Sequence, residues 1–110
     1  MIEHLDFMRE ALREAQRAGT KEEVPVGAVL VCDGKVVARG CNLTRTRRDP
    51  TQHAEIVAIQ KYSKTINNER LTGCSLYVTL EPCAMCAGAI VQARLPVVVF
   101  GAKDPKAGAC

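Results

Sequence analysis

A chain of 110 residues, with 47% hydrophobic and 25% charged residues, has the size and balance of one globular domain, which excludes disordered, collagen-like and coiled-coil proteins. The net charge of +3 permits a nucleic-acid partner without requiring one, and the 4% aromatic content argues against a stacking platform for single strands. No apolar run approaches ~20 residues and the N-terminal residues are charged, so we expect a cytoplasmic domain over residues 1–110 without a membrane span.

The hydrophobic pattern predicts helices and strands in the order α-β-β-α-β-α-β. In chain order these are a helix over 2–18, strands over 25–32 and 35–41, a helix over 53–64, a strand over 74–80, a helix over 83–93 and a strand over 97–100. Asp33-Gly34 predicts a tight hairpin between the first two strands, and Thr51 is a candidate cap of the second helix. The strand–helix–strand order at the end predicts a parallel pair, so we expect a mixed sheet of four strands covered by helices.

Six cysteines in a chain this short need a chemical explanation. Because no secretory signal accompanies them, metal ligation fits better than a disulfide scaffold. Cys83 and Cys86 form a C-x-x-C motif at the expected start of the third helix, where both sulfurs share one face and the helix dipole should lower the thiol pKa. With His53 they offer three ligands, the number in a catalytic zinc site that keeps a fourth position for water.

Glu55 lies two residues after His53, in the first turn of the same expected helix. A carboxylate that does not bind the metal can carry protons between water, substrate and leaving group, so this set favours hydrolytic chemistry. Two other interpretations stay open at this point. The C-x-x-C could be a redox pair, or the site could be a structural zinc site with a fourth ligand from Cys32, Cys41, Cys74 or Cys110.

The motif His53-Ala54-Glu55 followed by Pro82-Cys83-x-x-Cys86 resembles the signature of the zinc-dependent cytidine deaminase-like superfamily. Further stretches are similar to its tRNA-acting adenosine deaminases, namely residues 23–28, 42, 49–55, 76–83, 85–89 and 98–104. The resemblance implies a three-layer α-β-α fold with a central mixed sheet. Members of the family continue for some tens of residues beyond this point, so we expect a C-terminal strand and helices to be missing here.

The resemblance also implies a zinc-dependent hydrolase that deaminates adenosine to inosine at wobble position 34 of a tRNA anticodon. His53, Cys83 and Cys86 would hold one Zn²⁺ per subunit, and Glu55 would move protons from the attacking water to the purine and to the departing ammonia. The flipped base would be contacted by Val26, Asn42, Ala54, Glu81 and Pro82. Val26 could equally be a core residue of its strand.

Basic residues flank the expected pocket and could contact the phosphates of an anticodon stem-loop from an arginine tRNA. They are Arg45, Arg47 and Arg48 after the second strand, and Lys103 and Lys106 after the last. The resemblance further implies a homodimer. Two other functions stay open: a deaminase of free guanine or cytosine with the same fold, and a zinc-stabilised module that binds RNA without catalysis. The intact Glu55 argues against the second, because a structural site has no use for that carboxylate.

Overall fold

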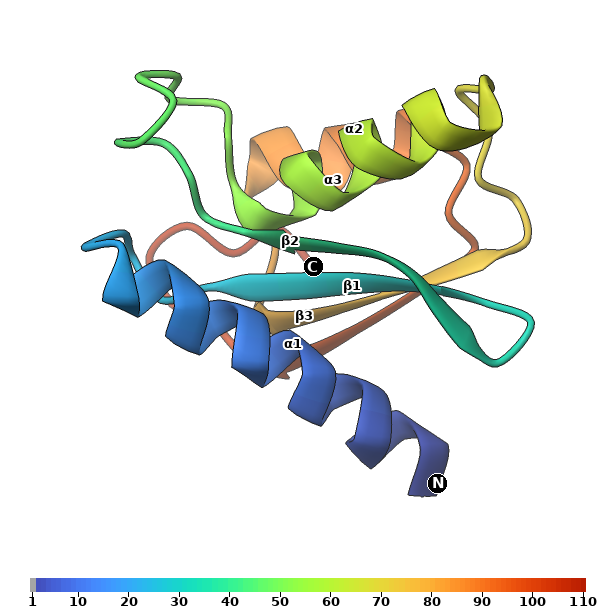
Figure 1. Ribbon diagram of the computed structural model, residues 1–110, viewed down its shortest axis with the longest axis horizontal. Helices are drawn as coiled ribbons and strands as arrows, with labels where there is room; N and C mark the ends of the chain where they lie inside the picture. The colour runs from blue at the N-terminus through green and yellow to red at the C-terminus, as the bar shows by residue number, and fades with distance from the viewer. Residues whose placement is uncertain (1) are drawn as a thin grey trace.

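The computed structural model describes residues 2–110, and the side chains from residue 4 onward. The order of elements is the one that the hydrophobic pattern predicts (Figure 1). The elements are α1 (Ile2–Thr20), β1 (Gly27–Cys32), β2 (Lys35–Cys41), α2 (Ala54–Ile66), β3 (Cys74–Leu80), α3 (Ala84–Gln92) and β4 (Val97–Ala102). Within the described residues, no helix combines the length and the apolar character needed to cross a bilayer.

The four strands form one mixed sheet in the order β2-β1-β3-β4. Strand β1 is antiparallel to both β2 and β3, whereas β3 and β4 are parallel and joined by α3. The expected parallel pair is therefore confirmed. Helix α1 covers one face of the sheet, and α2 and α3 lie side by side on the other, which gives the three-layer arrangement (Figure 1).

Alternation along β1 supplies both faces of the sheet with buried side chains. Ala28 and Leu30 belong to the core beneath α2 and α3, whereas Val29 and Val31 belong to the core beneath α1. A strand buried on both faces reads as a continuous apolar run, which explains why residues 28–31 show no polar alternation. The sheet thereby fixes α2 and α3 next to each other, with both N-termini at the end of the molecule that carries the predicted motif residues.

The hairpin between β1 and β2 has the expected geometry. Asp33 and Gly34 have φ values of 53° and 74°, as a two-residue turn of type I′ requires. The expected cap of the second helix is wrong: His53 occupies the N-cap position, and no side chain caps this helix. Thr51 is instead bound locally, because its N–H and its hydroxyl both donate to the Asp49 carboxylate, at 2.8 and 2.6 Å.

Candidate active site and metal centre

Three potential metal ligands meet where the N-termini of α2 and α3 lie together. His53 directly precedes α2, Cys83 directly precedes α3, and Cys86 lies in the first turn of α3. The His53 Nδ1 atom is 3.6 Å from the Cys83 Sγ and 3.4 Å from the Cys86 Sγ, and the three ligand atoms all lie within 4.8 Å of one another. Segments some thirty residues apart in sequence thus place one nitrogen and two sulfurs around a common point.

These distances fit a tetrahedral zinc ion. Bonds of about 2.3 Å to sulfur and about 2.0 Å to nitrogen hold tetrahedral ligands about 3.5 Å apart, close to the spacing found between His53 and the two sulfurs. An imidazole with two thiols is a donor set that suits Zn²⁺. In the described part of the chain, no other His, Cys, Asp or Glu joins this group. A structural zinc site would need a fourth cysteine ligand, and the described residues do not place one beside these three ligands.

The helix dipole does not have the expected effect on the buried thiol. Burial raises the pKa of Cys86 above its ordinary value, and the neighbouring Glu55 and Cys83 raise it further. Cys86 is fully buried, and desolvation disfavours its thiolate. A bound cation would supply the positive charge that a thiolate needs at this place, which agrees with the donor geometry.

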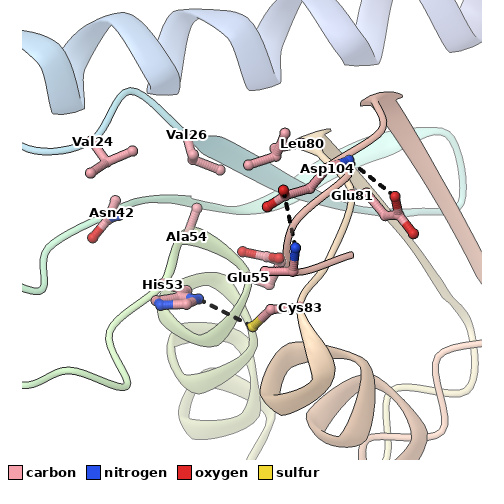
Figure 2. Close-up of a pocket in the computed structure, with 11 residues that line it drawn as sticks. Val24, Val26, Asn42, His53, Ala54, Glu55, Leu80, Glu81, Cys83 and Asp104 are labelled. Carbon is pink, nitrogen blue, oxygen red and sulfur yellow. Dashed lines mark hydrogen bonds between the residues drawn. The ribbon is translucent and has the colours of Figure 1, made fainter. Parts of the chain in front are cut away.

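Glu55 lies beside the ligand cluster, in the first turn of α2, and is only 4% exposed. Burial raises the pKa of its carboxyl above the ordinary value, although its own backbone N–H, the His53 ring and the Cys86 thiol act in the opposite direction. Figure 2 shows the carboxylate close to both His53 and Cys83. A carboxyl group in this setting can exchange a proton with a reactant held against the cluster.

A pocket of about 230 Å³ opens over the cluster and Glu55 (Figure 2). Four of the five residues predicted to contact a base line it: Val26, Asn42, Ala54 and Glu81. The fifth, Pro82, is fully buried and is not a lining residue. Ala54 is the first residue of α2, a position whose backbone N–H has no partner within the helix.

Four other lining residues were missed by sequence reasoning: Val24, Leu80, Asp104 and Ala107. Val24 and Leu80 are each within two residues of a predicted contact, so the sequence held a local signal for them. Asp104 and Ala107 directly follow the predicted phosphate contacts Lys103 and Lys106, but the sequence did not place them in the pocket, because they reach it only when the segment after β4 folds back on the turn after β3.

The basic residues stand on two sides of this pocket. Arg45, Arg47 and Arg48 are exposed on the loop that follows Asn42, and Lys103 and Lys106 are exposed beside Asp104. Figure 2 shows Asn42 and Asp104 on opposite sides of the pocket. The Arg45 guanidinium donates to the Glu22 carbonyl at 3.1 Å, and the Arg47 guanidinium to the Gln52 Oε1 at 2.8 Å.

A three-layer fold with a His–Cys–Cys group beside a buried glutamate is the architecture of the zinc-dependent deaminases. The chain belongs to one family among them, because the family model of the cytidine and deoxycytidylate deaminase zinc-binding region matches residues 1–102.

Named relatives in this family are similar over nearly the whole chain. A tRNA-specific adenosine deaminase of Agrobacterium fabrum is 54% identical over 109 residues, which are 99% of this chain and 72% of that protein. A solved structure from studies of A-to-I editing by tRNA:A34 deaminases is 54% identical, with a TM-score of 0.93, over 96% of this chain and 81% of that one.

A guanine deaminase structure from Bacillus subtilis is also similar, with a TM-score of 0.88 and 40% identity over 91% of this chain and 64% of that one. The chain spans between 60 and 72% of the length of five bacterial tRNA-specific adenosine deaminases that it matches.

Proposed function

We propose that this chain catalyses the zinc-dependent hydrolytic deamination of adenosine to inosine at wobble position 34 of a tRNA anticodon. The observation that carries the proposal is the grouping of His53, Cys83 and Cys86 at a pocket that Glu55 also lines. Relatives named as tRNA-specific adenosine deaminases, at 54% and 52% identity, support the choice of an RNA substrate.

The zinc ion would be held by the Nδ1 atom of His53 and the sulfurs of Cys83 and Cys86. When bound, zinc supplies Lewis-acid activation of a water molecule for attack at C6 of the purine. Glu55 accepts the proton that this water loses and delivers it to the adjacent ring nitrogen. The same carboxylate then takes the proton of the hydroxyl group added at C6 and gives it to the amino group, which leaves as ammonia while C6 becomes a carbonyl. Its raised pKa suits this role, because a group that must both accept and donate works best when its pKa approaches the ambient pH.

The rest of the pocket would orient the base. The unpaired backbone N–H of Ala54 and the polar side chain of Asn42 offer hydrogen bonds, while Val26 packs against the ring. Pockets for drug-sized ligands occupy roughly 300–1,000 Å³, so a pocket of about 230 Å³ suits a single nucleobase. The ribose and phosphates would then lie outside, within reach of the exposed basic residues on either side.

The partners follow from the same proposal. The arginines after β2 and the lysines after β4 would contact the phosphates of an anticodon stem-loop. The tRNA would be an arginine tRNA, and the reaction would take place in the cytoplasm. A homodimer would use the outer surface of α3, where Met85 and Gly88 are exposed. The domain over residues 1–110 would carry the chemistry, and the further length of the relatives would add surface for tRNA.

Inosine formation on an arginine-type anticodon stem-loop with A34 tests the proposal directly. The zinc-loaded protein is given this RNA, the same RNA with G34, and free guanine and cytosine in parallel. We expect inosine only from the A34 RNA. Turnover of a free base alone would instead establish the second candidate, a small-molecule base deaminase, which the similarity to the guanine deaminase structure favours.

A further inference from the structure

Glu81, which follows β3, uses its carboxylate to bind backbone rather than solvent. The residue is 7% exposed, and both of its oxygens are occupied. The Asp104 N–H donates to Oε1 at 3.1 Å, and the Cys110 N–H donates to Oε2 at 2.8 Å (Figure 2 shows the first of these). Hydrogen bonds from N–H groups to a carboxylate are stronger than those between neutral groups, so Glu81 holds residues 104–110 at both ends.

Between these two points, residues 104–108 form hydrogen bonds with one another. The Asp104 Oδ1 accepts the backbone N–H groups of Lys106 at 3.0 Å and Ala107 at 3.2 Å. The Asp104 carbonyl accepts the N–H of Gly108 at 3.0 Å. The loop therefore has a defined shape, and that shape presents Asp104 and Ala107 to the pocket.

The segment also lies directly on the turn that leads into α3. Ala109 donates its N–H to the Pro82 carbonyl at 3.0 Å, and Gly108 forms a β-bridge with Cys83. A Cβ on Gly108 would overlap the Glu81 carboxylate and lie 2.6 Å from the Asp104 carbonyl oxygen. Only a glycine permits this close approach, so Gly108 and Glu81 depend on each other.

We propose that Glu81 is a positioning residue that holds residues 104–110 as one wall of the pocket and so sets substrate affinity. The inference rests on the proposed function for the identity of the substrate. Glu81 is poorly placed for proton transfer, because backbone donors occupy both of its oxygens, and Glu55 lies closer to the ligand cluster. Loss of the wall should therefore weaken binding of the RNA while the chemical step proceeds.

Two variants of the full chain test this role by different routes. Glu81→Gln turns one acceptor oxygen into an NH₂ group that faces an N–H donor, and Gly108→Ala displaces the segment while it keeps the carboxylate. In both variants, we expect the Asp104 and Cys110 amides to exchange hydrogen at least about tenfold faster. With the A34 stem-loop, we expect KM to rise about tenfold and kcat to stay within about twofold. Glu69→Gln, at an exposed glutamate outside the pocket, is the control and should change neither quantity.

Hydrogen exchange needs no substrate, so it tests whether Glu81 holds residues 104–110 even if the wild-type protein does not deaminate RNA. Failure of the wild-type protein to deaminate RNA would overturn only the proposed function. Unchanged amide exchange in Glu81→Gln would show that Glu81 does not hold this segment. Faster exchange together with a large fall in kcat and an unchanged KM would show that Glu81 acts in the chemical step. A circular dichroism spectrum and a zinc content equal to those of wild type establish that each variant is folded. If Glu81→Gln does not fold, Gly108→Ala alone provides the test.

Discussion

Gly40 of β2 lies so close to Ala54, the first residue of α2, that a Cβ on Gly40 would overlap the Ala54 carbonyl oxygen. The same Cβ would lie 2.7 Å from the backbone N of Ala58, one turn further along the helix. Helix α2 therefore rests on the bare backbone of β2. This contact fixes the height above the sheet of the turn that carries His53 and Glu55.

A Gly40→Ala substitution should destabilise the fold and displace this turn. Overpacking of a well-packed contact costs about 1–3 kcal/mol, which corresponds to a fall in Tm of roughly 4–8 °C for each kcal/mol in a domain of this size. Thermal unfolding and the rate of deamination should both report the change. Gly19→Ala is the matched control, since Gly19 lies in α1 with its nearest neighbour at 3.9 Å, and its Tm should stay level or rise slightly. Equal Tm values for the two variants would contradict the close packing.

Replacement of Glu55 by Gln should separate chemistry from metal binding. The amide keeps the size of the side chain but cannot take up and release a proton, so the deamination rate should fall by about 10²–10⁴-fold. Bound zinc, measured by atomic absorption, should stay at one per chain, because Glu55 is not one of the three grouped ligands. Full activity in Glu55→Gln would overturn the mechanism.

Local signals in the sequence predicted most of the fold. The bounds of β2 and β3 agree with the expected ones, because Asp33-Gly34 and Pro82 mark their ends with backbone conformations that few other residues favour. The Thr51 cap failed for a local reason as well: the N-cap position of α2 falls at His53, two residues after Thr51, and the Thr51 hydroxyl donates to the Asp49 carboxylate instead.

The site was predictable to the extent that its residues lie in short motifs. His53, Glu55 and the C-x-x-C could be singled out because their spacing alone suggests metal and proton chemistry. The wall formed by Asp104 and Ala107 could not, because it depends on hydrogen bonds between residues more than twenty positions apart. The same reason hides the function of Glu81, whose partners are backbone groups that carry no signature.

Removal of the metal should lower stability as well as abolish activity. The cluster ties the start of α2 to the start of α3, and a ligand present at 1,000 times its Kd stabilises the folded state by roughly 4 kcal/mol. At about 4–8 °C for each kcal/mol, we expect chelation to lower Tm by roughly 15–30 °C and zinc to restore it. Cys86→Ser should lose this response, whereas Cys110→Ser should keep it, because Cys110 is exposed and outside the cluster. A Tm of Cys86→Ser that still responds to zinc would place the ion elsewhere.

Glu23 should make the stability of the loop that carries Arg45, Arg47 and Arg48 depend on pH. The carboxylate is buried and accepts the N–H of Arg45 at 3.1 Å, the N–H of Thr46 at 2.6 Å and the Thr46 hydroxyl at 2.7 Å. Burial alone would raise the pKa of Glu23, but the hydrogen bonds from Thr46 and Arg45 and the positive charge of Arg45 outweigh it, so the pKa lies below the ordinary value of 4.5.

A folded-state pKa below the unfolded value means that the Glu23 contribution to stability is complete above about pH 4.5 and is lost as the pH falls through the lowered pKa. We therefore expect Glu23→Gln to be less stable than wild type at pH 7, with a difference in urea midpoint that shrinks as the pH falls below about 4.5. Thr46→Val, which removes the hydroxyl donor but not the backbone N–H groups, should show a smaller difference of the same sign. A difference that stays constant from pH 7 to pH 3 would mean that the charge of Glu23 does not hold this loop.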